Sequence, residues 1–224
     1  MPPFRGRPPW RATCPHQIIV EGQDDQMAFD VLAAALRARG ENIATFDALS
    51  AESQSKIPRL LLEFTLDSSF LELAESITIV VDADDAPATA FATIQSACAE
   101  ARLPVPDSVG AWEIGAFQGQ DRRVRIVVVP PLGNGALEDL VLAGIPEKTR
   151  QCVEAYLECA ADFGTPKPKQ RSKARIQALA ATRLHDGYMH LGAALRDGKL
   201  PLDHPAMEPL RAILRSLWGT PAGR

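Results

Sequence analysis

One segment restricts the possible folds more than any other: the run Ile77-Thr78-Ile79-Val80-Val81, which leads directly into Asp82-Ala83-Asp84. Its residues are β-branched on both faces of an extended chain. Such a run is typical of a central parallel strand that is covered on both sides. Parallel strands need crossover connections, which are usually helices. The segment therefore predicts an α/β fold with acidic residues at the carboxyl end of a buried strand.

The residues around this strand alternate between strand and helix patterns. Gln17 to Val20 is a short apolar run that breaks at Glu21-Gly22, and a helical pattern then continues to Gly40. Further strands are expected near residues 43–49, 111–117 and 124–129. Further helices are expected over residues 53–74, with a break near Asp67, over 88–102, and from 136. We predict an α/β protein with a mostly parallel sheet flanked by helices.

The two ends of the chain differ from this middle part. After about residue 147 only helical patterns remain, which predicts an all-α extension. Residues 1–16 hold several prolines and three arginines, a composition typical of a disordered basic tail. The expected organisation is a tail over 1–16, an α/β domain over 17–145 and a helical extension over 146–220.

Composition narrows the cellular setting and the partners. The net charge of −4 argues against a protein that coats nucleic acid by bulk charge, but it leaves room for a local basic face. No window approaches the length of an apolar membrane span, and no signal peptide is apparent. The four cysteines form no CxxC pair, so a reducing, cytoplasmic location is expected. Cys152 and Cys159 would share a helix face, where we expect both to be buried.

Three carboxylates form the clearest chemical pattern. Glu21 follows the first strand, and Asp82 and Asp84 follow the strand described above. If these strands are neighbours, the three groups meet at one edge of the sheet. Asp82 and Asp84 would point the same way if the extended geometry continued through Ala83. Close carboxylates repel one another, and a hard cation such as Mg²⁺ or Mn²⁺ removes the conflict. A purely structural alternative is that Asp82 or Asp85 caps the following helix.

An ordered set of short motifs resembles the Toprim domain. The segments are Val20-Glu21-Gly22-Gln23-Asp24-Asp25, Val80-Val81-Asp82-Ala83-Asp84 and Gly135-Ala136-Leu137-Glu138-Asp139-Leu140. The third is similar to a segment of small Toprim proteins related to OLD-type nucleases, many of which end in a helical extension. The resemblance implies metal-dependent phosphoryl transfer, with Glu21, Asp82 and Asp84 as catalytic and metal-binding residues. It also implies Asp25 and Glu138 as ligands of a second metal ion.

Two basic stretches are candidate contacts for a phosphate backbone. The denser stretch includes Lys169, Arg171 and Lys173, of which Lys173 is the preferred single contact. A second cluster, Arg122, Arg123 and Arg125, precedes an expected strand. The alternative in both cases is a solvated surface.

Three functions remain open at this level. The leading hypothesis is an Mg²⁺- or Mn²⁺-dependent nuclease that acts on DNA or RNA. The alternative is a non-catalytic Toprim-fold subunit that binds an ATPase partner, as in a phage-defence system, because the chain has no P-loop of its own. The third is a phosphatase of the haloacid-dehalogenase type, which also carries Asp-x-Asp after a strand. A homodimer is compatible with each of these functions.

Overall fold

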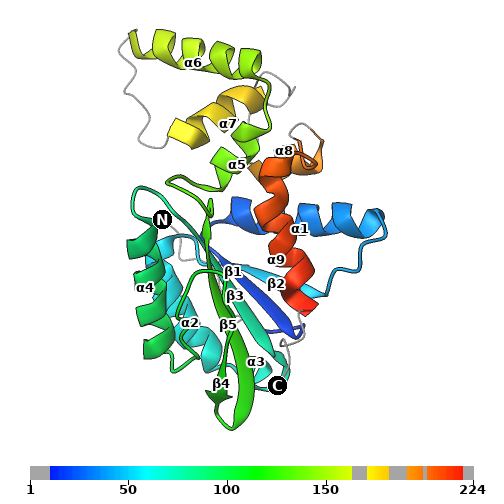
Figure 1. Ribbon diagram of the computed structural model, residues 1–224, viewed down its shortest axis with the longest axis vertical. Helices are drawn as coiled ribbons and strands as arrows, with labels where there is room; N and C mark the ends of the chain where they lie inside the picture. The colour runs from blue at the N-terminus through cyan, green and yellow to red at the C-terminus, as the bar shows by residue number, and fades with distance from the viewer. Residues whose placement is uncertain (1–10, 163–170, 182–190, 199–200, 219–224) are drawn as a thin grey trace, which may run out of the picture.

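The strand that begins at Ser76 lies in the middle of a five-stranded sheet in the computed structural model (Figure 1). The structure describes residues 11–162, 171–181, 191–198 and 201–218. The strands are β1 (His16–Val20), β2 (Phe46–Ser50), β3 (Ser76–Asp82), β4 (Glu113–Phe117) and β5 (Gln120–Val129). Their order is β2-β1-β3-β5-β4, and every neighbouring pair is parallel except β4 with β5. The α/β class predicted from the sequence is therefore confirmed.

The strand order reverses between β1 and β3. From β1 the chain moves outward to β2, and it then returns across β1 to form β3 on the other side. Ligands of open α/β sheets bind at such a switch point, outside the carboxyl ends of the strands. Glu21 directly follows β1, and Asp82 is the last residue of β3. The topology therefore makes these two acidic positions neighbours.

Helices on one face of the sheet build the first of two cores. Helix α1 (Gln23–Ala38) buries Phe29, Leu32 and Leu36, which recur at helical spacing. They pack with Ile18 and Val20, the inward residues of β1. Helices α8 (Leu191–Arg196) and α9 (Glu208–Arg215) lie against α1 on the same face (Figure 1).

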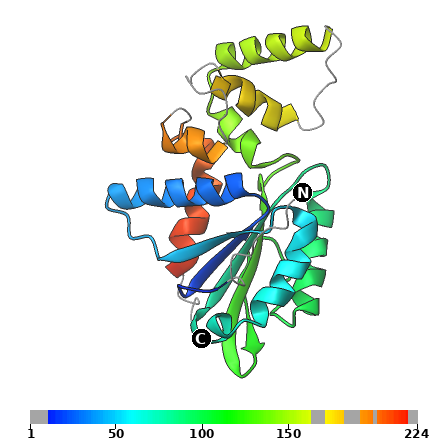
Figure 2. The same ribbon diagram turned by 180° about the vertical axis from the view of Figure 1, so that it is seen from behind.

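The opposite face carries the second core. It is covered by α2 (Ile57–Thr65), α3 (Ser68–Leu73) and α4 (Pro87–Glu100), which Figure 2 shows across the sheet from α1 and α9. Ile77 and Ile79 of β3 point into this core with Phe64 and Phe70. Strand β3 is buried from Ser76 to Val81, as its β-branched run predicted.

The remaining helices stand above the carboxyl end of the sheet. They are α5 (Leu137–Ala143), α6 (Glu147–Asp162) and α7 (Arg171–Ala181), and α7 packs against both α5 and α6. The helices that follow residue 146 therefore lie in two places, because α8 and α9 return to α1. Gly192 of α8 permits this return, since a side chain there would collide with Met27 of α1.

Two expectations about side chains were wrong. Arg122 and Arg125 do not form a surface rim, because both are buried. Arg125 donates to Thr78 Oγ1 at 2.9 Å and to the Ile213 carbonyl at 2.8 Å, which fixes α9 to the sheet. Cys152 and Cys159 are exposed on α6 instead of buried.

In the described residues, none of the helices is long and apolar enough to cross a membrane.

Candidate acidic site at the carboxyl end of the sheet

Glu21 and Asp82 are in direct contact. The Glu21 Oε1 atom accepts a hydrogen bond of 2.8 Å from the backbone N–H of Asp82. This bond crosses between the ends of two adjacent parallel strands, which is where the sequence predicted that the acidic residues would meet. The condition that their strands are neighbours is therefore met.

Asp82 and Asp84 do not continue as one extended strand. Strand β3 ends at Asp82, and Asp84 adopts a left-handed backbone conformation with φ of 44°. The backbone of Asp84 pairs instead with Gly135, through hydrogen bonds of 2.7 and 2.8 Å. Asp82 Oδ1 accepts a hydrogen bond of 3.0 Å from the N–H of Leu137, the first residue of α5. Asp82 thus caps α5 and not α4, while Asp84 is exposed to solvent.

Asp25 and Glu138 add two more carboxylates from the first turns of α1 and α5. The Asp25 Oδ2 atom accepts a hydrogen bond of 2.8 Å from the N–H of Gly22, which orders the start of α1. Glu138 is 2% exposed. Its Oε2 atom is buried without a hydrogen-bond partner among the described residues. An unpaired buried carboxylate oxygen costs free energy and marks a place where a ligand is expected.

Helix α7 brings basic residues to this acidic group. Lys173 Nζ lies 3.9 Å from Glu138 Oε1, and about half of the Lys173 side chain is exposed. Arg171 is bound to Glu154 of α6, at 2.7 Å. Ser172, which the sequence did not single out, donates to Asp139 Oδ1 at 2.6 Å. Lys169, the third predicted basic contact, lies outside the described residues.

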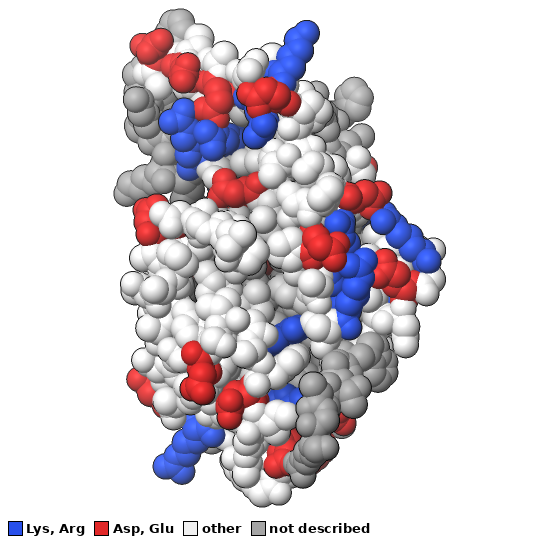
Figure 3. Space-filling view, in the orientation of Figure 1, with Lys and Arg blue, Asp and Glu red and all other residues white. Residues whose placement is uncertain are grey.

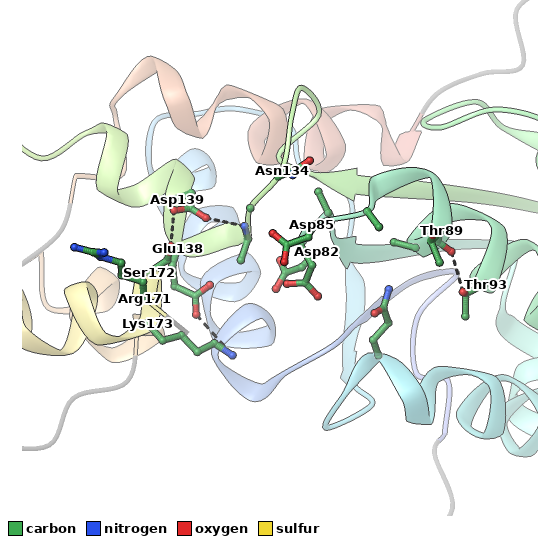
Figure 4. A pocket seen from close by; sticks show the side chains of 17 residues that line it. Asp82, Asp85, Thr89, Thr93, Asn134, Glu138, Asp139, Arg171, Ser172 and Lys173 are labelled. Carbon is green, nitrogen blue, oxygen red and sulfur yellow. Dashed lines mark hydrogen bonds and ion pairs between the residues drawn. The ribbon is translucent and has the colours of Figure 1, made fainter. Parts of the chain in front are cut away.

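A cleft of about 650 Å³ lies between the end of β3, α4, α5 and the start of α7, and Glu21 and Asp25 are not among its lining residues. Figure 4 shows Asp82 and Asp85 facing it from the end of β3, while Glu138 and Lys173 face it from α5 and α7. The far wall includes Thr89 and Thr93 of α4, which repeat at one helical turn. That spacing on the polar side of α4 was the available sequence signal for these two threonines.

Burial and mutual repulsion control the protonation of the cluster. Burial, and after it the charges of Asp25, Glu21 and Glu138, raise the pKa of Asp82 to about 8. Burial also raises the pKa of Glu21 to about 7, although the N–H of Asp82 opposes the shift. Burial is also the largest cause of the raised pKa values of Asp25 and Glu138. The positive charge of Lys173 opposes both shifts.

The fit of a divalent ion depends on these donors. Their oxygen atoms are the type that Mg²⁺ and Mn²⁺ prefer, and the unpaired Glu138 Oε2 atom is available. As the side chains stand, the described residues include no set of three acidic, histidine or cysteine groups arranged to hold one ion. An ion would therefore bind with a rotation of side chains such as Asp82 or Glu138. The donor chemistry fits the ion, but the site is not pre-formed.

The surface around α6 and α7 mixes both charges. Figure 3 shows basic and acidic side chains side by side near these helices, whereas the surface over α4 in this view carries few charges. Glu154 pairs with both Arg171 and Arg175, which explains part of the mixture. The predicted basic contacts are therefore close to the cleft but already engaged with acidic partners, Lys173 with Glu138 and Arg171 with Glu154.

The fold and the site define a three-layer α/β protein with an acidic cleft at its switch point. Residues 15–219 match a family model described as a protein of unknown function (DUF3226). Because this match covers most of the chain, the protein belongs to the DUF3226 family. No curated protein and no solved structure matches the chain.

Proposed function

We propose that the protein is an Mg²⁺- or Mn²⁺-dependent nuclease of the Toprim type, related to OLD nucleases. The observation that carries the proposal is the hydrogen bond between Glu21 and Asp82 at the switch point of the sheet. The charges of Glu21, Asp25 and Glu138 act on Asp82, and Asp82 and Glu138 line a cleft that is open to substrate. Catalysis of phosphodiester hydrolysis uses such carboxylates to hold divalent ions.

Each residue then has a defined task. A bound divalent ion would polarise the phosphate and lower the pKa of a water molecule. Asp82 and Glu138 would hold the ion, and their rotation toward it would relieve their repulsion. Glu21 has a pKa of about 7, so it is able to accept or release a proton near neutral pH. Lys173 would meet a phosphate oxygen at the opposite wall of the cleft, where half of its side chain is exposed.

Cleavage assays on the full chain test this function. Labelled single- and double-stranded DNA and RNA are incubated with Mg²⁺ or Mn²⁺ and the wild-type protein. We expect Glu21→Gln and Asp82→Asn to lower the rate by about 100-fold or more, which is the usual contribution of an acid–base group. Glu72→Gln is the matched control, because Glu72 is an exposed residue of α3 away from the cleft. Equal cleavage by all these variants would contradict the proposal.

The exposure of α6 favours a second candidate, a non-catalytic subunit that binds an ATPase. Val153 is the buried residue of this helix of 16 residues, and Tyr156 is 63% exposed. Large exposed aromatic residues are common at protein interfaces. If no nucleic acid is cleaved, a pull-down with the wild type and with Tyr156→Ser distinguishes this candidate. This candidate function requires that the wild type captures an ATPase and that Tyr156→Ser captures less of it.

A further inference from the structure

Helix α6 has one side that packs on α7 and another that is exposed. Val153 is buried and Leu157, one turn later, is partly buried, so these residues lie on the packed side. Cys152 and Cys159 are exposed, and Tyr156 between them is 63% exposed. Figure 1 shows α6 on the outer side of α7, far from the sheet. A molecule that approaches this end of the protein therefore meets α6 first.

The exposed side of α6 carries opposite charges at its two ends. Lys148 lies near the amino end of the helix and Asp162 is its last residue, and both are exposed. The positions of Lys148, Cys152, Cys159 and Asp162 are four, seven and three residues apart, which keeps them on one side of a helix. An antiparallel second copy of α6 would place Lys148 opposite Asp162 of that copy. A parallel copy would bring like charges together.

The exposed residues of α6 are also arranged as a two-fold axis requires. Three pairs share one centre, at or beside Ala155: Lys148 with Asp162, Gln151 with Glu158, and Cys152 with Cys159. A two-fold axis through Ala155, perpendicular to the helix, brings each member of a pair opposite the other member in the second copy. The first pair then joins opposite charges, and the second joins an amide donor to a carboxylate. Tyr156 lies beside the axis in both copies, and tyrosine is enriched at protein interfaces.

We propose that the exposed side of α6 binds a second copy of this chain, with the two α6 helices antiparallel about a two-fold axis at Ala155. This inference does not depend on the proposed nuclease. A helix of 16 residues is about 24 Å long, so the contact is small and the dimer should dissociate on dilution. The acidic cleft stays open in this dimer, because its lining residues do not include α6.

The first test measures the mass of the full chain by sedimentation velocity at several concentrations. We expect the wild type to change from monomer to dimer as the concentration rises. Asp162→Lys should weaken the dimer about tenfold, because it replaces two attractive pairs by two repulsive ones. Adding Lys148→Glu to this variant should restore the dimer, since opposite charges again face each other. Glu72→Lys, a similar change of charge on α3, is the matched control and should dimerise as the wild type does.

The second test uses the two cysteines of α6 to report the direction of the helices. Cys152 and Cys159 lie about 10 Å apart along one helix, which is too far for a disulfide within the chain. Packed helices have axes about 8–10 Å apart, so facing Cα atoms of two copies come within the range of a disulfide. The oxidant is diamide, which takes up the two hydrogen atoms that a pair of thiols loses.

The cross-links distinguish an antiparallel from a parallel pair. On a non-reducing gel we expect a linked dimer for the wild type and none for Cys152→Ser or Cys159→Ser alone. A mixture of these two variants should form the linked dimer again, because each supplies the cysteine that the other lacks. Cys14 and Cys98 stay unchanged in every sample and serve as internal controls.

Three results would overturn the inference. A monomer at every concentration, without cross-links, would leave the exposed side of α6 to a different protein, such as the ATPase considered above. A dimer that Asp162→Lys does not weaken would place the contact on another surface. Linked dimers in both single-cysteine variants would show parallel helices. None of these results bears on whether the protein is a nuclease.

Discussion

Two aspartates of the same sheet, Asp47 on β2 and Asp82 on β3, are both partly buried, but their pKa values are shifted in opposite directions. Asp47 lies at the amino end of its strand. Partial burial favours its neutral form, but hydrogen bonds from Thr13, Gln17 and Cys14 outweigh this and lower its pKa. Asp82 lies at the carboxyl end. Burial and the charges of the neighbouring carboxylates outweigh its one backbone donor and raise its pKa to about 8.

The difference separates an end of the sheet where the charged carboxylate is stabilised from one where it is destabilised. At Asp47, donors are supplied by the protein itself, at 2.7 Å from Thr13 N and at 3.0 Å from Cys14 N and from Gln17 Nε2. At Asp82, the described donor is the N–H of Leu137, and the charged groups that act on it are carboxylates. A protein retains such a destabilising cluster where a ligand compensates for it, and perturbed carboxylates gather at functional sites for this reason.

The largest expected effect is on the stability contributed by Asp82. A carboxyl group with a raised pKa binds more protons in the native than in the unfolded state between pH 3.8 and about 8. The free energy of unfolding therefore decreases as the pH rises through this range, by on the order of a few kcal/mol from Asp82. Without metal, Asp82→Asn should be more stable than the wild type at pH 8. Urea unfolding followed by circular dichroism at pH 5 and pH 8 measures the difference.

The control for this prediction is Asp107→Asn, which removes an exposed charge far from the cleft. Its free energy of unfolding should change with pH as that of the wild type does. If the free energy of unfolding of Asp82→Asn decreased with pH as steeply as that of the wild type, the charged form of Asp82 would not destabilise the fold. The contrast with Asp47 would then disappear.

An intermediate effect is expected at Asp47. Asp47→Ala leaves the N–H groups of Thr13 and Cys14 without their acceptor and should lower the free energy of unfolding at pH 7 by about 1–2 kcal/mol. Because the folded pKa of Asp47 is lowered, its contribution is present above pH 3.8 and is lost as the pH falls through the folded pKa. The measurement is urea unfolding at pH 7 and pH 3, with Asp107→Ala as control. An unchanged midpoint at pH 7 would contradict this account.

The smallest effect is expected from Thr13→Ala. It removes one donor, the Thr13 hydroxyl group at 2.5 Å from Asp47 Oδ1, and keeps the backbone bond. The loss in stability should stay below about 1 kcal/mol, while the pKa of Asp47 rises. A carboxyl titration by nuclear magnetic resonance measures the pKa. A pKa equal to that of the wild type would show that the backbone donors alone hold Asp47 ionised.

The sequence by itself determined the α/β class, because β-branched runs buried on both faces require a covered parallel strand. It also determined that Glu21 and Asp82 end strands, since each directly follows an apolar run. It could not determine the strand order, and that order alone makes β1 and β3 neighbours.

Other features were decided by tertiary contacts between residues far apart in the chain. Asp84 leaves the extended strand because its backbone pairs with Gly135, and Arg125 is buried because α9 returns to cover it. Lys173 meets Glu138 only because α7 packs on α5. Local patterns give the type and limits of an element, but the partner of a charge depends on which distant element packs beside it.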